Sequence, residues 1–228
     1  MIHIIQNDPQ VPPGLLADQL DRLKQRWSLV QTWREEALPE PSLITAVIVL
    51  GGAMGANEDT KFPFLSPLKK FIGEIVEQGI PYLGVCLGGQ LLAAALGAKV
   101  VSNRWEELGT LEVTLNQAGC QDPLLKNIGK LLTTFQWHHD SFDLPEGALL
   151  LASSPACPHQ AFRFGRTAWG LQFHPEVTET IIRDWCAWDP ATKVRTEELL
   201  NAWRARKVEY CQVSARLLDN FLMVAKDT

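Results

Sequence analysis

The sequence predicts an α/β protein: a three-layer sandwich with a central, mostly parallel sheet and helices on both faces. Two observations lead to this prediction. Short apolar runs alternate with amphipathic helical patterns through the first hundred residues, which is the order of strand–helix units in a parallel sheet. The chain is also long enough, at 228 residues, for one large domain or a domain with an appendage.

The first hundred residues supply the expected parallel strands and their helices. Ala46–Leu50 is a continuous apolar run, which is typical of a strand buried on both faces. Ser66 is expected to cap the helix that follows and Pro67 to occupy its first position, with Gly79 closing it. Strands are expected at 1–6, 27–33, 46–50 and 80–85, and helices at 14–26, 66–79 and 87–96.

After Gly97 the pattern changes to a run of short strands and then to helices. The strands predict a mixed or antiparallel extension of the sheet, and 107–115 alternates apolar and polar residues as a half-buried strand does. The remaining strands are expected at 99–102, 131–135, 149–153, 161–164 and 167–173, and helices at 177–188, 191–205 and 208–225.

These elements predict one domain over residues 1–180 and a C-terminal helical extension over 181–228, packed on the same domain. Trp185, Trp188 and Trp203 in this tail have two interpretations. They could face a partner protein, since aromatic residues are enriched at interface cores. We favour the alternative, in which they pack the terminal helices onto the chain's own domain.

Composition and charge exclude several classes of protein. Hydrophobic residues make up 46% and charged residues 21%, with a net charge of −5 and no long basic run, which argues against a nucleic-acid partner. The five cysteines are scattered without a Cys-x-x-Cys pair, which argues against a disulfide framework and a structural zinc site. No signal peptide or membrane span is evident, so we expect a soluble cytoplasmic protein without a membrane partner.

The segment Gly84-Val85-Cys86-Leu87-Gly88 has the spacing of a nucleophile elbow, with sulfur in place of the usual serine oxygen. Glycines two residues on either side remove side chains that would collide in such a sharp strand-to-helix turn. The helix that follows would direct its N-terminal amides toward the sulfur and favour the thiolate. Because a lone cysteine in an apolar run is more often a core residue, the interpretation depends on the rest of the chain.

His174-Pro175-Glu176 supplies a base and a carboxylate at the end of an apolar strand. A thiol nucleophile needs a base, and histidine has a suitable pKa. Pro175 biases His174 toward an extended conformation, in which residues two apart point to the same side. Glu176 could therefore orient the imidazole, although the same three residues could also be no more than a polar strand end.

Backbone amides could stabilise the oxyanion formed when a thiolate attacks a carbonyl. Leu87 offers one amide directly after the cysteine, and Gly52 offers a second from the Gly51–Gly55 loop that follows the buried strand. Taken alone, two glycines after a strand more often form a simple turn.

Trp137-His138-His139-Asp140 contains two adjacent histidines and an aspartate, which raises the question of a metal. Adjacent residues of an extended chain point apart, so His138 and His139 would not easily share one ion. We favour a polar loop lining the site, and we expect neither a metal nor an organic cofactor.

Together these motifs resemble the class I, triad-type glutamine amidotransferases, and the chain is most similar to stand-alone proteins related to the amidotransferase domain of GMP synthase. The resemblance covers about residues 1–176 and rests on three motifs in the same order: Gly51-Gly52, Gly84–Gln90 and His174-Pro175-Glu176. Further similar stretches are 137–145, 150–154 and 160–163. Two positions depart from the family pattern, with Ala53 at the usual proline of the Gly-Gly-Pro loop and His139 at the usual glycine of Trp-His-Gly-Asp.

The resemblance implies a role for each matching residue. Cys86 would be the nucleophile, His174 the base and Glu176 its partner. Gly52 and Leu87 would give the oxyanion amides. Gln90, Trp137 and His138 would contact the bound glutamine.

The function expected is hydrolysis of the γ-amide of glutamine, or of a γ-glutamyl compound, through a Cys-His-Glu triad and a γ-glutamyl thioester. The ammonia would go to a separate synthetase subunit, since the chain has no phosphate-binding loop. The alternative is a stand-alone γ-glutamyl peptidase or hydrolase with no ammonia acceptor. A non-catalytic regulatory relative is disfavoured because all three triad residues are present, and a cysteine hydrolase of an unrelated acyl substrate because Gln90 and 137–140 match the family.

Overall fold

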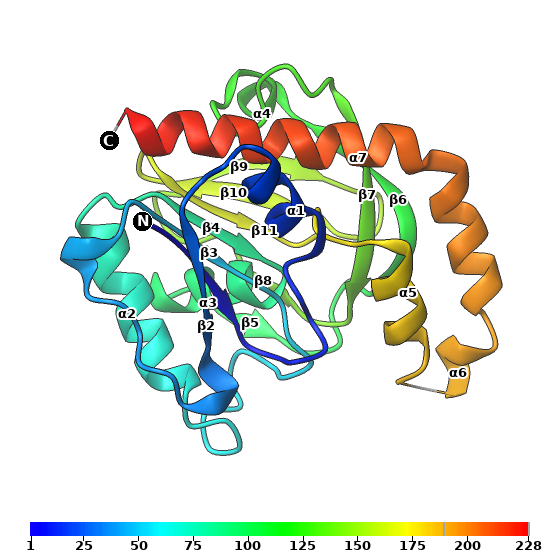
Figure 1. The fold of residues 1–228 in the computed structure, drawn as a ribbon. Coiled ribbons are helices and arrows are strands. Elements are labelled where there is room, and N and C mark those ends of the chain that lie inside the picture. The colour runs from blue at the N-terminus through cyan, green and yellow to red at the C-terminus, as the bar shows by residue number, and fades with distance from the viewer. Residues whose placement is uncertain (189, 228) are drawn as a thin grey trace.

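The computed structural model of the chain describes residues 1–188 and 190–227 (Figure 1). Residues 189 and 228 of the expected C-terminal extension lie outside the described residues. The main sheet has nine strands in the order β2-β1-β3-β4-β11-β10-β9-β6-β7. These are β1 (Ile2–Gln6), β2 (Trp27–Gln31), β3 (Ala46–Val49), β4 (Tyr82–Val85), β6 (Glu107–Leu115), β7 (Leu131–His138), β9 (Leu149–Ser153), β10 (Ala161–Phe164) and β11 (Ala168–Leu171). A separate pair joins β5 (Val100–Val101) to β8 (Ser141–Phe142).

The sheet has a parallel part and an antiparallel part, as the sequence predicts. Strands β2, β1, β3, β4 and β11 are parallel neighbours, and β1, β3, β4 and β11 are buried along their whole length. Such strands need mostly apolar side chains on both faces, which explains the continuous apolar run of β3; in β1 the buried His3 and Gln6 interrupt the run and face Ser28 and Gln31 of β2 at hydrogen-bond distance. Strands β10, β9, β6 and β7 extend the sheet by antiparallel pairing.

Helices cover both faces of the sheet and so form the predicted three layers (Figure 1). Side chains of β3 alternate between two hydrophobic cores: Ala46 and Ile48 enter one, and Val47 and Val49 the other. This alternation is the two-residue period of a strand. The first core is closed by α1 (Gly14–Arg22), α5 (Glu179–Cys186) and α7 (Thr196–Lys226), and the second by α2 (Leu65–Glu77) and α3 (Leu87–Ala95).

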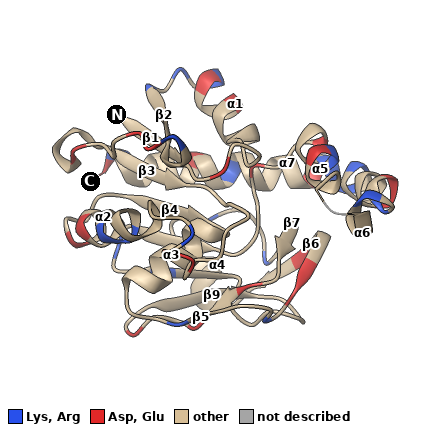
Figure 2. Cartoon of the chain, turned by 90° about the horizontal axis from the view of Figure 1, so that it is seen from below, with Lys and Arg blue, Asp and Glu red and all other residues tan. Residues whose placement is uncertain are grey.

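The C-terminal tail differs from the expectation of two long helices. A single 31-residue helix, α7, runs from Thr196 to Lys226, because no glycine or proline interrupts this stretch. It packs against α1, α5, β6 and β7. Both signs of charge are interspersed along α5, α6 (Pro190–Lys193) and α7 (Figure 2), and Arg206 reaches back to Glu112 of β6 at 3.0 Å.

Several smaller expectations also change. Helix α2 begins at Leu65, so Ser66 lies inside its first turn and does not cap it. Strand β2 ends at Gln31, where a 3₁₀ turn, η1 (Thr32–Arg34), takes over. A second 3₁₀ turn, η2 (Pro41–Leu43), and a short helix, α4 (Gln117–Gln121), were not predicted. Among the described residues, no helix combines the length and the apolar character needed to cross a bilayer.

Candidate functional site

Cys86 lies on a strained turn between β4 and α3. Its φ of +49° and ψ of −105° are unusual for a residue with a side chain. The flanking glycines make this turn possible. A Cβ on Gly84 would lie 2.4 Å from the carbonyl carbon of Gly88, and a Cβ on Gly88 would lie 2.1 Å from the carbonyl oxygen of Val49. The Gly-x-Cys-x-Gly spacing is therefore a steric requirement of the turn.

The turn is anchored in the middle of the parallel sheet. The Cys86 amide donates to the Leu171 carbonyl of the neighbouring strand β11 at 2.9 Å. The hydroxyl of Tyr82 in β4 donates to the Gly88 carbonyl at 2.8 Å and so ties the strand to the helix. Gln172 directs its side-chain amide at the Cys86 sulfur, 3.7 Å away. The sulfur is thus held at the carboxyl ends of two adjacent strands, where ligands bind in open α/β sheets.

His174 and Glu176 follow β11, the strand beside β4, and the fold brings them to the cysteine. His174 Nδ1 and Glu176 Oε1 are 2.7 Å apart and both side chains are buried. Pro175 separates them in sequence, and the pairing is the one expected for residues two apart in an extended segment. Within 1–188 and 190–227, His174 Nε2 and Glu176 Oε2 have no hydrogen-bond partner. One ring nitrogen is therefore fixed by the carboxylate while the other is available for proton transfer.

The electrostatic surroundings of His174 favour its protonated form. Burial lowers the pKa of the imidazole, but the negative charge of Glu176 and the neighbouring Cys86 outweigh this effect and raise the pKa to about 10. A protonated imidazole beside Cys86 can act as a general acid toward a leaving group.

Tyr210 of α7 holds the His174–Val177 segment from behind. Its buried hydroxyl donates to the His174 carbonyl at 2.8 Å and accepts from the Val177 amide at 2.9 Å. Burial raises the pKa of this hydroxyl well above its ordinary value, so the proton stays available for donation. Sequence analysis did not identify Tyr210, because 36 residues separate it from His174 and no local pattern links the two.

A pocket of about 250 Å³ opens above the sulfur. Its walls come from five parts of the chain: Val11, the 52–55 loop, the Cys86–Gln90 turn, Trp137–Asp140 and the segment after β11. The predicted residues Gly52, Cys86, Gln90, Trp137, His138 and His174 all line it, whereas Leu87 and Glu176 lie just behind. The volume is slightly below the roughly 300–1,000 Å³ typical of small-molecule sites.

The 51–55 loop lies against His174 and Cys86. A Cβ on Gly51 would lie 3.1 Å from His174 Cε1 and 3.6 Å from Cys86 Cβ, so a side chain at this position would press on the imidazole. Among the described residues, neither the Gly52 amide nor the Leu87 amide donates a hydrogen bond. The loop lacks the family's proline, but the Ala53 amide is fixed by Asp8 Oδ2 at 3.1 Å.

A polar group formed by Gln90, His138 and Asp140 lines another part of the pocket. The Asp140 carbonyl accepts from Gln90 Nε2 at 3.1 Å and faces His138 Nδ1 at 3.2 Å. His139 points away from this group, as the sequence predicts for neighbouring residues: it is exposed and contacts Glu106 at 3.2 Å.

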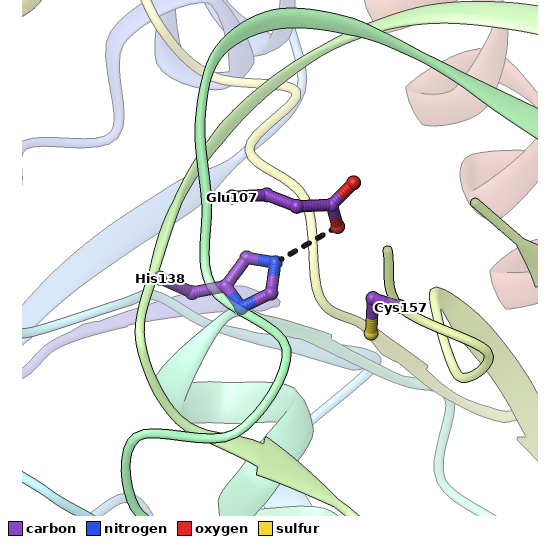
Figure 3. A group of neighbouring side chains, drawn as sticks. All are labelled: Glu107, His138 and Cys157. Atoms are coloured by element: carbon purple, nitrogen blue, oxygen red, sulfur yellow. Dashed lines mark hydrogen bonds and ion pairs between the residues drawn. The ribbon is translucent and has the colours of Figure 1, made fainter. Parts of the chain in front are cut away.

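A buried cluster of Glu107, His138 and Cys157 lies behind this polar group (Figure 3). The three potential metal ligands lie within 4.8 Å of one another. The carboxylate of Glu107 is already occupied, however. It faces His138 Nε2 at 3.3 Å and accepts from Ser154 Oγ at 2.8 Å and from the side-chain amide of Gln160. A cation would have to displace these donors, so the geometry fits a support for His138 better than a metal centre.

Trp185 of α5 and Trp188 just after it also line the pocket, which the sequence analysis did not predict. The expected packing onto the chain's own domain holds for Trp203, which is buried in α7. Trp185 is buried as well, but its ring stands edge-on to His174 with centroids 4.9 Å apart. Two tryptophans three residues apart, in the helical stretch that follows the His-Pro-Glu segment, are the signal that could have indicated this.

Comparison with known proteins connects this geometry to a family. The family model for class-I glutamine amidotransferases matches residues 15–184. The chain is 33% identical over 156 residues to the glutamine amidotransferase-like protein YfeJ of Salmonella typhimurium, covering 67% of this chain and 64% of that protein. It is 38% identical over 117 residues to GMP synthase (glutamine-hydrolysing) of Marinobacter nauticus, covering 47% of this chain and 22% of the synthase. The chain thus matches less than two thirds of the length of either relative.

Solved structures extend the similarity to the whole chain. A glutamine amidotransferase from Thermotoga maritima superposes with a TM-score of 0.86 at 32% identity, over 97% of both chains. A glutamine amidotransferase from Methylobacillus flagellatus gives the same TM-score at 26% identity, over 97% of this chain and 94% of its own. The C-terminal helical part is therefore shared with these proteins. This chain belongs to the class-I glutamine amidotransferase family.

Proposed function

We propose that this protein hydrolyses the γ-amide of glutamine, or of a γ-glutamyl compound, through a triad of Cys86, His174 and Glu176. The observation that supports this most is the His174–Glu176 pair. One ring nitrogen is held at 2.7 Å by a buried carboxylate, and the other is unpartnered in the pocket that contains the cysteine sulfur. This is the arrangement of base and orienting acid that nucleophilic catalysis requires.

In the first half-reaction the Cys86 thiolate attacks the γ-carbonyl carbon. The carbonyl oxygen becomes an oxyanion that the free amides of Gly52 and Leu87 stabilise. The C–N bond then breaks, and the leaving nitrogen takes the proton that His174 carries. The products of this step are a γ-glutamyl thioester on Cys86 and ammonia or an amine.

In the second half-reaction water replaces the sulfur. His174, now neutral, accepts a proton from the water as it attacks the thioester carbonyl. Collapse of the intermediate releases glutamate and restores the thiolate–imidazolium pair. Gln90, His138 and the main chain of Trp137–Asp140 bind the α-amino and α-carboxylate groups, because these residues form the polar part of the pocket.

Two fates of the leaving nitrogen are compatible with this chemistry. The similarity to GMP synthase supports delivery of ammonia to a separate synthetase subunit. The alternative is a free-standing hydrolase of γ-glutamyl amides. We further propose that α5–α7 form an extension of residues 1–180 that braces the site, since Tyr210 of α7 contacts His174.

Glutamate release tests this proposal. Purified protein is incubated with glutamine and, separately, with γ-glutamyl amides, and free glutamate is quantified. Wild-type protein should release glutamate, and Cys86→Ala and His174→Ala should not. Equal release by wild type and Cys86→Ala would refute the mechanism.

A further inference from the structure

Three tryptophans form a continuous aromatic surface in the pocket. We call Trp137, Trp185 and Trp188 the aromatic wall. Each ring contacts the other two, with centroid separations of 5.6 Å for Trp137–Trp185, 6.1 Å for Trp137–Trp188 and 5.5 Å for Trp185–Trp188. All three line the pocket above Cys86. Trp137 and Trp188 are half-buried and Trp185 is buried, so the first two supply most of the exposed part of an aromatic surface that chemistry on glutamine alone does not require.

Two rings of the wall, Trp137 and Trp185, are held by residues outside it. The indole nitrogen of Trp185 donates to the Gln10 carbonyl at 2.8 Å, which fixes that ring. Phe135 packs behind it, with its ring 6.3 Å from Trp137 and 6.3 Å from Trp185. A preformed aromatic surface binds a flat apolar group without the entropic cost of ordering side chains.

The wall adjoins the side of the pocket from which the nitrogen leaves. Gln90, His138 and Asp140 are linked by hydrogen bonds and form the polar part that suits the charged α-groups of glutamate. His174 protonates the leaving nitrogen in the proposed function, and its ring packs against that of Trp185 with centroids 4.9 Å apart. A substituent on that nitrogen would therefore extend along the wall.

The charges of the pocket restrict what this substituent can be. No lysine or arginine occurs among the described residues that line it, and the protonated His174 is already paired with Glu176, so a carboxylate on the leaving group would find no unpaired cation there. The lining carboxylate, Asp140, is engaged by Ser102 Oγ at 3.2 Å and by the Asn103 amide at 3.1 Å, so it offers little to a second ammonium group. A neutral, flat substituent fits these conditions.

From these observations we infer that the preferred substrates are γ-glutamyl amides whose leaving amine carries a neutral aromatic group. This inference rests on the proposed function and names its substrate class. Cys86 forms the thioester, the C–N bond breaks, and the amine leaves with the proton from His174. Water then releases glutamate, and no further reactant is needed.

The test compares γ-glutamyl amides of primary amines that differ in the group carried by the leaving nitrogen. The probes are γ-glutamyl-2-phenylethylamide, γ-glutamylethylamide and γ-glutamylphenylalanine, with glutamine as a reference. We expect kcat/KM for the phenylethylamide to exceed that for the ethylamide about tenfold, the order expected for an extra apolar group in a hydrophobic pocket. The added carboxylate of γ-glutamylphenylalanine should reduce this advantage. Equal kcat/KM for the two neutral amides, or a preference for γ-glutamylphenylalanine, would overturn the inference.

Variants of the wall provide the second arm. In Trp188→Ala the phenylethylamide-to-ethylamide ratio should fall toward one, and in Trp188→Phe it should largely persist. Because the ratio is taken within one variant, a change in the folded fraction cancels. Trp33→Ala removes a similarly half-buried tryptophan outside the pocket and should leave the ratio unchanged. An unchanged ratio in Trp188→Ala would overturn the inference.

The two levels of the proposal fail in different ways. Hydrolysis of glutamine and of both neutral amides with a ratio of one refutes the aromatic preference and leaves the proposed function standing. No glutamate from any probe refutes both.

Discussion

Tyr210→Phe separates the support of the site from its chemistry. The substitution removes one buried oxygen that bridges the His174 carbonyl at 2.8 Å and the Val177 amide at 2.9 Å. The Val177 amide is then buried without its acceptor, which costs about 1–3 kcal/mol of the free energy of unfolding. The segment that carries His174 and Glu176 also loses its tie to α7. Since displacement of a catalytic group by about 1 Å can cost up to about a hundredfold in rate, we expect kcat to fall at least several-fold.

The assay is urea unfolding followed by fluorescence, together with glutamate release measured on the same preparations. The matched control is Asn220→Ala on the same helix. Asn220 also makes two hydrogen bonds, to the carbonyls of Leu124 and Lys126 at 2.9 and 2.8 Å, but these tie α7 to a loop remote from the pocket. Asn220→Ala should lower the free energy of unfolding by about 1 kcal/mol and leave kcat unchanged. Wild-type kcat in Tyr210→Phe, or an equal loss of kcat in both variants, would refute the reasoning.

Three further predictions concern the turn, the buried carboxylate and pH. Gly88→Ala should unfold the elbow or destabilise the protein by several kcal/mol, since the new Cβ would lie 2.1 Å from the Val49 oxygen. Gly73→Ala, in the interior of α2 with nothing within 4 Å, should instead stabilise it by up to about 1 kcal/mol; thermal unfolding compares the two. Glu107→Gln should raise KM for glutamine about tenfold with a smaller change in kcat, because His138 loses its support. Glu107→Asp should bring KM part of the way back toward the wild-type value. If Glu107 has a purely structural role, KM should stay at the wild-type value in both variants. The contribution of His174 to the free energy of unfolding should be largest below pH 6.5 and fall as the pH rises toward 10, because Glu176 and Cys86 raise the folded pKa of His174 and its stabilising proton is lost there; Glu176→Gln should flatten this slope in urea titrations at pH 6 and pH 9.

Local sterics explain why much of the fold was predictable from sequence. The buried strands β1, β3 and β4 are predominantly apolar, and each ends at a polar or glycine-rich turn. No other residue fits at Gly84 or Gly88 beside Cys86, because an added Cβ would overlap backbone atoms at both positions. Such features depend on residues close in sequence, so the pattern records them directly.

The parts of the site that were missed depend on contacts between distant residues. Tyr210 reaches His174 from α7, Glu107 meets His138 across two strands, and Trp188 closes a wall with Trp137. No local period encodes these contacts, because they follow from how α5 and α7 pack on the sheet. The division of α7 into two helices is a different kind of error: the absence of glycine and proline from 196 to 226 already favoured a single helix.

The central claim is that Cys86 is a nucleophile activated by the His174–Glu176 pair. Its most direct test is rapid quenching of the protein with glutamine or a γ-glutamyl amide, followed by mass spectrometry of the peptide that contains Cys86. We predict a mass increase of one glutamyl group on Cys86 in the wild type. The adduct should disappear in Cys86→Ala and form more slowly in Glu176→Gln. Turnover without any adduct on Cys86, or glutamate release that persists in Cys86→Ala, would contradict the claim.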